Sequence, residues 1–484
     1  MSAIALLRIN AMTYEFLPPL RDNQLIDLLY PFDENAIFMI STEGSRTQRE
    51  FLSDVYSLAS LLPQKKYAVN LCEERYGFLV SFCACLLNQT INLLPPNRQN
   101  NTLADLTADY PDAFYVVDHQ RDAASLNGSL KTIAVTEALH TPPLNKSVAL
   151  PQIPAQQIAA LAFTSGSTGK PKPNPKPFGT LAGLARLLGA DLLKDQAPVM
   201  VATVPSQHMY GLETTIFMAL QTPAILHNQK PFFPVDVKHL LDQLKTPALL
   251  ITTPTHLRAL TQANLSMPKA YGLLSATAPL DKALAQAAEQ LFQSSLYEIY
   301  GCTEAGSMAL RQSTLTDQWQ LLSGFSFTQH QAPADAIAID PTFAHVTIAD
   351  APHLPEAAQL QDVIDMQSDR QFLLKGRSAD LINVGGKRAS LANLTSHLLQ
   401  IEGVKDGVVF MPEPHAANKE CRPIALVISE REERDLLAEY AKLVDAVFIP
   451  RPLKKVDYLP RNATGKLTRE ALLHFWSQLN DANI

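Results

Sequence analysis

A run of hydroxyl-bearing and glycine residues, Thr164–Gly169, is followed by Lys170 and Lys172. This composition can bind phosphate, because glycine lets backbone N–H groups approach an anion, hydroxyls add donors and lysine neutralises charge. The apolar run 158–163 predicts a buried strand before it, and the spacing of Leu181, Leu184 and Leu188 predicts one face of a helix after it. A loop between a strand and a helix is a common phosphate site, although an ordinary linker remains an alternative.

The loop does not have the spacing of a Walker A motif. Only two residues separate Gly166 from Gly169, whereas that motif requires four, and Pro171 follows Lys170. A P-loop kinase is therefore disfavoured. The Pro-rich continuation at 171–179 is expected to be a surface connection within a domain.

Further segments with chemical side chains follow in order. They are PSQHMYGLE (205–213), LLSATAPL (273–280), YEIYGCTEAG (297–306), the stretch from Asp362 to Arg377, and LPRNATGK (459–466). With TSGSTGKPK (164–172) they resemble the ordered motifs of the adenylate-forming superfamily, which includes acyl- and aryl-CoA synthetases, peptide-synthetase adenylation domains and luciferases. The resemblance covers residues 161–466 and is loose over the first 150.

This resemblance implies an AMP-forming acid-thiol ligase. ATP and an aromatic or medium-chain carboxylic acid would give an acyl-adenylate, and a pantetheine thiol of coenzyme A or an acyl carrier protein would take the acyl group. Joining two anions and expelling pyrophosphate requires positive charge and hydrogen-bond donors where negative charge accumulates. The loop residues expected to hold the phosphates are Thr164, Ser165, Gly166, Ser167, Thr168, Gly169 and Lys172.

The resemblance also gives roles to residues around the nucleotide. Thr303 would donate to the α-phosphate and Glu304 would hold Mg²⁺ through its hard oxygen ligands; the alternative is a helix N-cap and a first-turn acid. Tyr300 would stack on adenine, unless it is a core tyrosine. On the other side of the base would lie Ala276, Thr277 and Ala278.

Asp362 would accept both ribose hydroxyls and Arg377 would reach the ribose or phosphates, with a surface aspartate as the alternative for Asp362. Lys466 would serve adenylate formation, unless it is only a solvated lysine. Gly386 resembles the glycine that lines a pantetheine tunnel, with a plain turn as the alternative. His208 would flank the carboxylate of the bound acid or be a core histidine, and no metal cluster accompanies it.

Some positions depart from the family pattern. The segment before Asp362 lacks the usual Thr-Gly, the expected hinge position is Ala379 with Asp380 next, and PNPKPFG (173–179) is unusual. These departures leave a rival interpretation, a degenerate non-catalytic nucleotide-binding scaffold. The presence of both Glu304 and Lys466 favours the enzyme.

The elements that must position these residues alternate in type. Helical periods at 51–62 and 75–87 alternate with apolar strands at 67–71, 113–118, 199–204 and 248–253, which indicates an α/β fold. The 484 residues exceed one hydrophobic core. We expect a large layered domain of sheets and helices over 1–377 and a small mobile α+β domain over 378–484. The small domain would be made of the segment 407–413, a strand at 423–429 and a helix at 431–444.

Composition limits the partners and the compartment. A formal net charge of −7 disfavours nucleic acid as a partner, and no segment predicts a membrane span. Five cysteines without paired spacing indicate free thiols and a cytoplasmic location; Cys83 and Cys85 are expected in the core.

The last hundred residues suggest a partner for the thiol step. Residues 380–484 contain fourteen Lys and Arg and fourteen Asp and Glu, so the negative excess lies in the larger domain. A basic cluster that an acidic carrier protein could approach comprises Arg451, Lys454, Lys455 and Arg461. The alternatives are a solvated patch or a grip on the coenzyme A phosphates.

Overall fold

The computed structural model describes residues 24–123, 126, 130–139, 149–164, 172–194, 196–331, 345–360, 362–377, 381–384, 387–412, 422–462 and 465–481. The chain divides into two units. The first holds the chain up to Ala276 with Lys282–Ser326 and Ala349–Ala358, and the second holds Thr277–Asp281, Phe327–Ile348 and Gln359 onward. The domain boundary expected between residues 377 and 378 stays a prediction.

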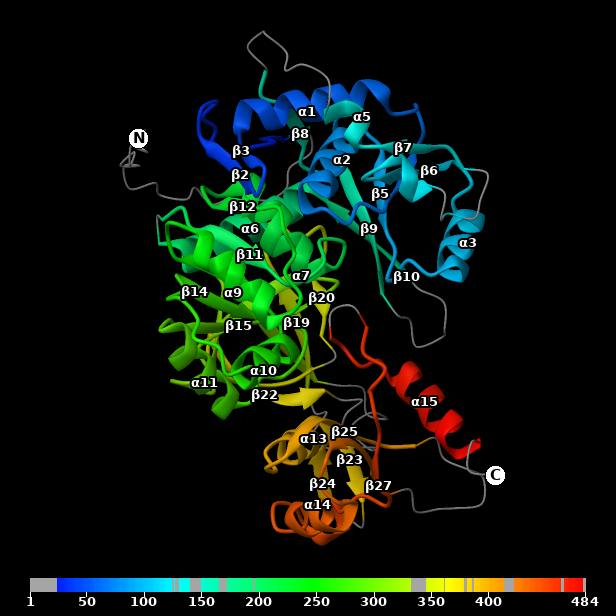
Figure 1. The fold of residues 1–484 in the computed structure, drawn as a ribbon, viewed down its shortest axis with the longest axis vertical. Helices are drawn as coiled ribbons and strands as arrows, with labels where there is room; N and C mark the ends of the chain where they lie inside the picture. Colours follow the sequence, from blue (N-terminus) through cyan, green and yellow to red (C-terminus); the bar gives the residue numbers. More distant parts are fainter. Residues whose placement is uncertain are drawn as a thin grey trace. The chain divides into compact units, whose positions relative to one another are not determined.

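A six-stranded sheet forms the first layer of the first unit (Figure 1). Its strand order is β10-β9-β5-β4-β6-β7, and all neighbours are parallel except β10 and β9. The strands are β4 (Tyr67–Asn70), β5 (Ile91–Leu94), β6 (Ala113–Val117), β7 (Thr132–Ala134), β9 (Ile158–Thr164) and β10 (Lys172–Pro177). The longer helices that precede or alternate with the first of these strands are α1 (Gln48–Leu61), α2 (Arg75–Leu87) and α3 (Asn100–Asp109).

Helix α2 lies in the core because nearly every position is apolar or small. Its residues are buried from Arg75 to Leu86, and Cys83 and Cys85 have no exposed surface. Helix α1 packs against it and begins at a capping box, in which Thr47 and Glu50 satisfy each other's backbone N–H groups. The expectation that both cysteines belong to the core is confirmed.

A larger sheet forms the second layer of the first unit. Within this unit its order is β17-β16-β15-β14-β13-β11-β12-β2-β3, with β2, β12, β11, β13, β14 and β15 parallel. Its strands are β2 (Ile37–Ser41), β3 (Gly44–Thr47), β11 (Val199–Ala202), β12 (Ile225–His227), β13 (Ala248–Thr252), β14 (Gly272–Ser275), β15 (Leu296–Cys302), β16 (Gly306–Arg311) and β17 (Trp319–Leu321). The longer helices that alternate with them are α6 (Phe178–Leu193), α9 (Pro234–Gln243), α10 (Pro254–Gln262) and α11 (Lys282–Phe292).

The Pro-rich segment 172–177 is a strand, so the expectation of a surface connection is wrong. β10 is the edge strand and pairs with β9. Successive residues of an edge strand alternate in the direction of their N–H groups, and Pro173, Pro175 and Pro177 occupy every second position. Proline is tolerated there because an outward N–H has no partner to lose.

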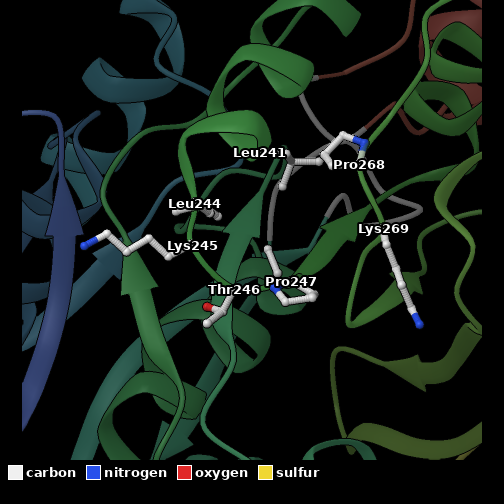
Figure 2. Close-up of a pocket in the computed structure, with 8 residues that line it drawn as sticks. Leu241, Leu244, Lys245, Thr246, Pro247, Pro268 and Lys269 are labelled. Atoms are coloured by element: carbon white, nitrogen blue, oxygen red, sulfur yellow. The ribbon is translucent and has the colours of Figure 1, made fainter. Parts of the chain in front are cut away.

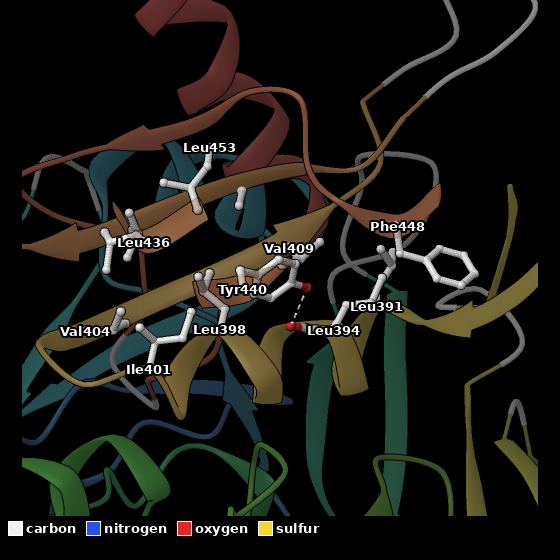
Figure 3. Packing of buried hydrophobic residues seen from close by; sticks show 12 residues of the cluster. Leu391, Leu394, Leu398, Ile401, Val404, Val409, Leu436, Tyr440, Phe448 and Leu453 are labelled. Atoms are coloured by element: carbon white, nitrogen blue, oxygen red, sulfur yellow. Dashed lines mark hydrogen bonds between the residues drawn. The ribbon is translucent and has the colours of Figure 1, made fainter. Parts of the chain in front are cut away.

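The second unit has its own core, which Figure 3 shows. Helix α13 (Leu391–Leu399), helix α14 (Glu433–Tyr440) and the sheet β25-β26-β27 contribute a cluster of buried aliphatic residues. The Tyr440 hydroxyl lies within it and donates to the carbonyl of Leu394 at 2.9 Å. The remaining elements here are β21 (Asp362–Ser368), β22 (Gln371–Arg377), β23 (Leu381–Val384), β24 (Lys387–Ser390), β25 (Val404–Phe410), β26 (Ile424–Ser429), the 3-10 helix η4 (Ala446–Phe448), β27 (Leu453–Lys455) and α15 (Arg469–Asp481).

The two cores confirm the expected α/β class with a smaller α+β part. The helix predicted over 431–444 is shorter in the structure, where α14 runs from Glu433 to Tyr440. No helix among the described residues is long and apolar enough to cross a membrane. The other elements are β1 (Leu25–Asp27), α4 (Gln120–Ala123), α5 (Thr136–Leu139), β8 (Gln152–Pro154), α7 (Met209–Gly211), the π-helix η1 (Leu212–Phe217), α8 (Met218–Gln221), β18 (Ser326–Gln331), β19 (His345–Asp350) and β20 (Ala358–Gln359).

Candidate active site

Three predicted segments lie at the carboxyl ends of parallel strands of the larger sheet. Residues 205–213 follow β11, Ala276 follows β14, and Tyr300 lies near the end of β15. Between β11 and β14 lies β13, and the hydroxyls of Thr203 and Thr252 are 3.0 Å apart at these carboxyl ends. The carboxyl ends of parallel strands are the usual place for ligands in α/β sheets, so the fold collects the predicted segments at a suitable edge.

The predicted phosphate loop connects two antiparallel strands. Thr164 and Lys172 are register partners at the open end of the β9–β10 hairpin. The expectation that the loop runs directly from a strand into a helix is therefore wrong, because β10 precedes α6. Ser165, Gly166, Ser167, Thr168 and Gly169 lie outside the described residues, and their phosphate contacts stay a prediction.

Thr303 and Glu304 lie in the tight turn between β15 and β16. Thr303 is half-buried and Glu304 is exposed. The alternative of a helix N-cap is wrong, since a strand follows the turn. Gly306 has φ +73°, and a Cβ there would lie 2.4 Å from Leu184 Cδ1, so both the turn and its packing require glycine.

Two buried charged side chains hold this turn, and neither was predicted. Lys176 Nζ donates to the carbonyl of Thr303 and, at 3.1 Å, to that of Glu304. Glu213 Oε2 accepts from the backbone N–H of Ser307 at 3.1 Å and from its hydroxyl at 2.5 Å. Lys176 is 2% exposed and Glu213 is 1% exposed. The turn is therefore fixed at both ends by one cation and one anion.

Burial and opposite charge act against each other on this pair. Burial lowers the pKa of Lys176, and the negative charge of Glu213 opposes that shift. Burial likewise raises the pKa of Glu213, opposed by its hydrogen bond from Ser307 and by Lys176. The lysine stands in the unusual segment PNPKPFG and the glutamate ends PSQHMYGLE. Both lay in the sequence stretches already singled out, but their partners are distant along the chain.

His208 precedes helix α7, beside a group of cations. Its Nε2 is buried without a hydrogen-bond partner among the described residues. Burial, with smaller contributions from Lys230 and Arg98, lowers the pKa of His208 to about 4. The imidazole is therefore neutral at neutral pH, with an unused ring nitrogen.

Arg75 fixes the backbone just before His208. Its guanidinium donates to the hydroxyls of Ser206 and Thr215 at 3.1 and 3.0 Å, and to the carbonyls of Ala202 and Val204 at 3.0 and 3.1 Å. Burial lowers the pKa of Arg75 to about 10. An arginine at the start of α2 thus connects the smaller sheet's layer to the 205–213 segment.

The residues expected around adenine come from neighbouring strands, since Ala276 follows β14 and Tyr300 lies in β15. Tyr300 is 7% exposed, and its ring centroid lies 5.7 Å from that of Trp319. Ala276 belongs to the first unit, whereas Thr277, with φ +82°, and Ala278 belong to the second. Stacking of Tyr300 on adenine stays a prediction.

Two predicted residues of the second unit meet across a hairpin. Asp362 and Arg377 are register partners in the β21–β22 pair, although they lie fifteen positions apart in sequence. Their joint action on one ligand stays a prediction. Gly386 lies outside the described residues, and its role stays a prediction.

Lys466 lies on a short braced loop. Its backbone N–H donates to Asn462 Oδ1 at 2.9 Å, and its carbonyl accepts from Asn462 N at 2.9 Å. Arg461 makes a bidentate pair with Asp406 at 2.8 and 2.7 Å and donates to the carbonyl of Gly465 at 2.9 Å. Arginine, asparagine and glycine in PRNATGK therefore fix the backbone from which the exposed lysine projects.

A family model described as AMP-binding enzyme matches residues 31–332. That range contains the turn at 303–304, the segments at 205–213 and 273–280, and the loop at 164–172. The chain belongs to the AMP-binding enzyme family.

Curated relatives of this AMP-binding enzyme are ligases by name. A 4-coumarate–CoA ligase of Halorhodospira halophila is 29% identical over 323 residues, covering 65% of this chain and 76% of the relative. A 3,4-dihydroxybenzoate–[aryl-carrier protein] ligase of Bacillus anthracis is 22% identical over 331 residues, covering 66% and 74%. The names divide between a CoA acceptor and a carrier-protein acceptor.

Solved structures share the fold of this AMP-binding enzyme. An o-succinylbenzoate coenzyme A synthetase of Bacillus subtilis, in complex with ATP and magnesium ion, has a TM-score of 0.76 at 18% identity. The match covers 93% of this chain and all of that one. An anthranilate CoA ligase in complex with anthranoyl-AMP gives a TM-score of 0.76 at 17% identity, covering 97% and 100%.

A surface pocket of this AMP-binding enzyme lies apart from these residues (Figure 2). It borders Ala248, the first residue of β13, and so lies at the amino end of the strand whose carboxyl end carries Thr252. Its volume is about 170 Å³, and Leu241, Pro247 and Pro268 contribute to its lining. No predicted site residue lines it.

The basic cluster expected near Lys466 is divided by the fold. Lys454 and Lys455 are adjacent in β27, so their side chains point to opposite faces. Lys454 Nζ donates to the carbonyl of Leu479 at 3.4 Å, and Arg461 is paired with Asp406. The expectation of a single joint basic patch is therefore wrong in this AMP-binding enzyme.

Proposed function

We propose that this AMP-binding enzyme is an ATP-dependent ligase that converts a carboxylic acid into an acyl-adenylate and transfers the acyl group to a pantetheine thiol. The observation that supports this most strongly is the anchored turn of Thr303 and Glu304, bonded to the strand that leaves the loop at 164–172. The turn would place a hydroxyl donor and a carboxylate beside the phosphates. The relatives' names favour aromatic acids.

The turn supplies a carboxylate suited to magnesium. Glu304 is exposed, and among the described residues no group of three or more His, Cys, Asp and Glu side chains could hold a metal by itself. This fits Mg²⁺, which is commonly bound by one or two carboxylates together with substrate phosphates. When bound, Mg²⁺ would neutralise phosphate charge; Thr303 would donate to the α-phosphate and Lys172 would face the departing pyrophosphate.

The acid would bind near His208. Lys230 and Arg98 are close enough to lower the pKa of His208, and the same positive charges would attract an anionic substrate. Because His208 is neutral at pH 7, it would orient the acid by a hydrogen bond rather than by charge. Arg75 would keep that imidazole in place through the backbone of residues 202–206.

The second unit would supply the residues that act around the ribose and the reacting bond. Asp362 would accept from the ribose hydroxyls and Arg377, its register partner, would reach the ribose or phosphate oxygens. Lys466 would place its ammonium on the acid and α-phosphate oxygens during adenylate formation. The braced loop beneath Lys466 supports this role, since fixing the backbone reduces what must be ordered when the side chain binds.

The rival interpretation, a non-catalytic scaffold, loses part of its basis. The segment PNPKPFG, one reason for that view, contains the lysine that binds the Thr303–Glu304 turn. The sequence before Asp362 also departs from the family, yet Asp362 stands opposite Arg377. We propose coenzyme A or an acyl carrier protein as acceptor. We also propose a cytoplasmic location, which is supported by the free thiols of the four cysteines among the described residues.

The test is ATP–pyrophosphate exchange across a panel of aromatic and medium-chain acids. We expect exchange with at least one hydroxylated or amino-substituted aromatic acid, followed by thioester formation with coenzyme A or a holo-carrier protein. Absence of exchange with every acid, together with retained nucleotide binding, would favour the scaffold. Comparing both acceptors at rising salt identifies the thiol partner, because an electrostatic approach to an acidic carrier is screened by salt.

A further inference from the structure

Three segments that are remote in sequence meet at the turn between β15 and β16. Lys176 lies in β10, Glu213 lies in the π-helix η1, and Ser307 is the second residue of β16. Lys176 binds the carbonyls of Thr303 and Glu304, and Glu213 binds the backbone and hydroxyl of Ser307. All of these residues belong to the first unit.

A fully buried lysine needs compensation, because lysine is almost never buried without partners. Lys176 has two carbonyl acceptors and the opposite charge of Glu213 nearby. An apolar side chain would fill the same space, but it would leave those two carbonyls without their donor. The ammonium therefore acts on the backbone of the turn and not only on the packing around it.

The position of Lys176 connects this turn to the loop at 164–172. Lys172 begins β10 and Lys176 lies four residues later in the same strand, which is paired with β9 throughout. A rigid strand thus joins the end of the loop to the ammonium that holds Thr303 and Glu304.

We propose that Lys176 is a positioning residue, which holds the Thr303–Glu304 turn in fixed register with the hairpin that carries the 164–172 loop, and that Glu213 completes the anchor at Ser307. Neither side chain touches the substrate. Together they keep the turn in a constant position relative to strand β10. The catalytic consequence rests on the proposed function, whereas the anchoring itself does not.

The anchoring is tested by amide hydrogen exchange in the whole protein. We expect Lys176→Met to raise exchange of peptides covering residues 302–307 by about tenfold or more, since local opening loses its charged donor. Lys282→Met, at an exposed lysine, is the matched control. If Lys176→Met folds poorly, Lys176→Met/Glu213→Gln removes both buried charges and should recover stability without recovering protection. Unchanged exchange at 302–307 in both variants overturns the proposal.

The positioning role is tested by pyrophosphate exchange and a double-mutant cycle. Lys176→Met should raise the KM for ATP while leaving the KM for the acid within about twofold, and its effect should be non-additive with Glu304→Gln because both act through one turn. Val55→Ala, at a buried site in α1, supplies a destabilised control whose effect should combine with Glu304→Gln additively. Additive behaviour of Lys176→Met overturns the positioning role.

The two proposals fail in different ways. If the wild type shows no ATP–pyrophosphate exchange with any acid, the proposed function fails. The double-mutant cycle of Lys176 and Glu304 is then measured on the affinity for Mg·ATP. If the wild type is active but Lys176→Met leaves the ATP dependence and the turn's protection unchanged, only the inference about Lys176 fails.

Discussion

The turn at 302–307 and the loop at 461–466 each present one or two predicted catalytic side chains, but the protein fixes them by different means. In the first, buried Lys176 and Glu213 bind the backbone and hydroxyl groups of the turn. In the second, Arg461 and Asp406 pair with side chains 21% and 22% exposed. Losing a partner in the first leaves an uncompensated buried charge, whereas water can solvate the second.

This difference suits the roles proposed for the two segments. A turn that holds phosphates and Mg²⁺ through both half-reactions benefits from a rigid buried anchor. A lysine needed only for adenylate formation requires a fixed loop backbone and an exposed side chain. The following experiments test whether changes at the buried turn affect stability and activity together, and whether changes at the partly exposed loop affect activity alone.

Lys466→Ala is expected to have the largest effect. Adenylate formation should fall about a thousandfold, because a positioned cation acts where negative charge accumulates, while transfer from a supplied acyl-adenylate to the thiol should be spared. Pyrophosphate exchange and single-turnover thioester formation measure the two steps. Equal loss of both steps would remove Lys466 from its assigned role.

Glu304→Gln should act on the metal rather than on one half-reaction alone. An amide oxygen is a poorer ligand for a hard cation than a carboxylate, so the Mg²⁺ concentration for half-maximal exchange should rise by about tenfold. Titration of exchange activity with Mg²⁺ at saturating ATP measures this. Gln312→Ala, at the residue that follows β16, is a control that should leave the Mg²⁺ dependence unchanged. An equal rise in the Mg²⁺ requirement of Gln312→Ala would contradict the assignment of Glu304 to the metal.

Acid should destabilise the first unit before the second. Burial lowers the pKa of His208, His227 and His353 from 6.5 to about 4. Between these values the unfolded chain binds more protons than the folded one, so stability falls as pH drops, by about 1–3 kcal/mol per histidine near pH 4. In the second unit, hydrogen bonds from Lys387 and Arg431 lower the pKa of the Asp445 and Glu439 carboxyls, so these groups take up protons only at lower pH than they do in the unfolded chain.

The two tryptophans make this measurable, since Trp319 lies in the first unit and Trp476 in the second. Denaturant unfolding of Trp476→Phe and Trp319→Phe, followed by fluorescence at pH 7 and pH 4.5, reports each unit. We expect the Trp319 midpoint to fall more than the Trp476 midpoint. Parallel decreases would show that the buried histidines do not distinguish the units. His353→Leu should reduce the pH dependence of the Trp319 signal.

The sequence predicted those parts of the fold that depend on local pattern. Apolar runs such as 113–117 became buried strands, and α2 was predicted with the same bounds. It also singled out the segment at 459–466, through the resemblance of LPRNATGK to a family motif. The contacts of Lys176 were not predictable, since a lysine between prolines usually indicates a solvated connection.

Long-range partners explain the other differences. Glu213 and Ser307 are 94 residues apart, and nothing in either segment specifies the other. The basic cluster is divided for a geometric reason, because Lys454 and Lys455 are adjacent residues of strand β27 and adjacent residues of a strand face opposite ways. Residue types therefore indicated the chemistry, while the backbone determined which side chains could act together.

Asp406→Asn is expected to have the smallest effect and gives the sharpest test of the comparison. It removes the charge that receives two hydrogen bonds from Arg461, yet both side chains are partly exposed, so the free energy of unfolding should fall by less than about 1 kcal/mol. Adenylate formation should fall severalfold, since the backbone below Lys466 is less fixed, and thiol transfer should not change. Glu430→Gln, which breaks the more exposed pair with Lys405, is the control and should affect neither step.

A loss of stability in Asp406→Asn as large as that of Lys176→Met would show that the partly exposed pair of Arg461 and Asp406 is an anchor of the same kind as the buried one. Unchanged adenylate formation would show instead that Asn462 and Gly465 hold the loop without it, because their hydrogen bonds to Lys466 and to each other do not pass through Asp406.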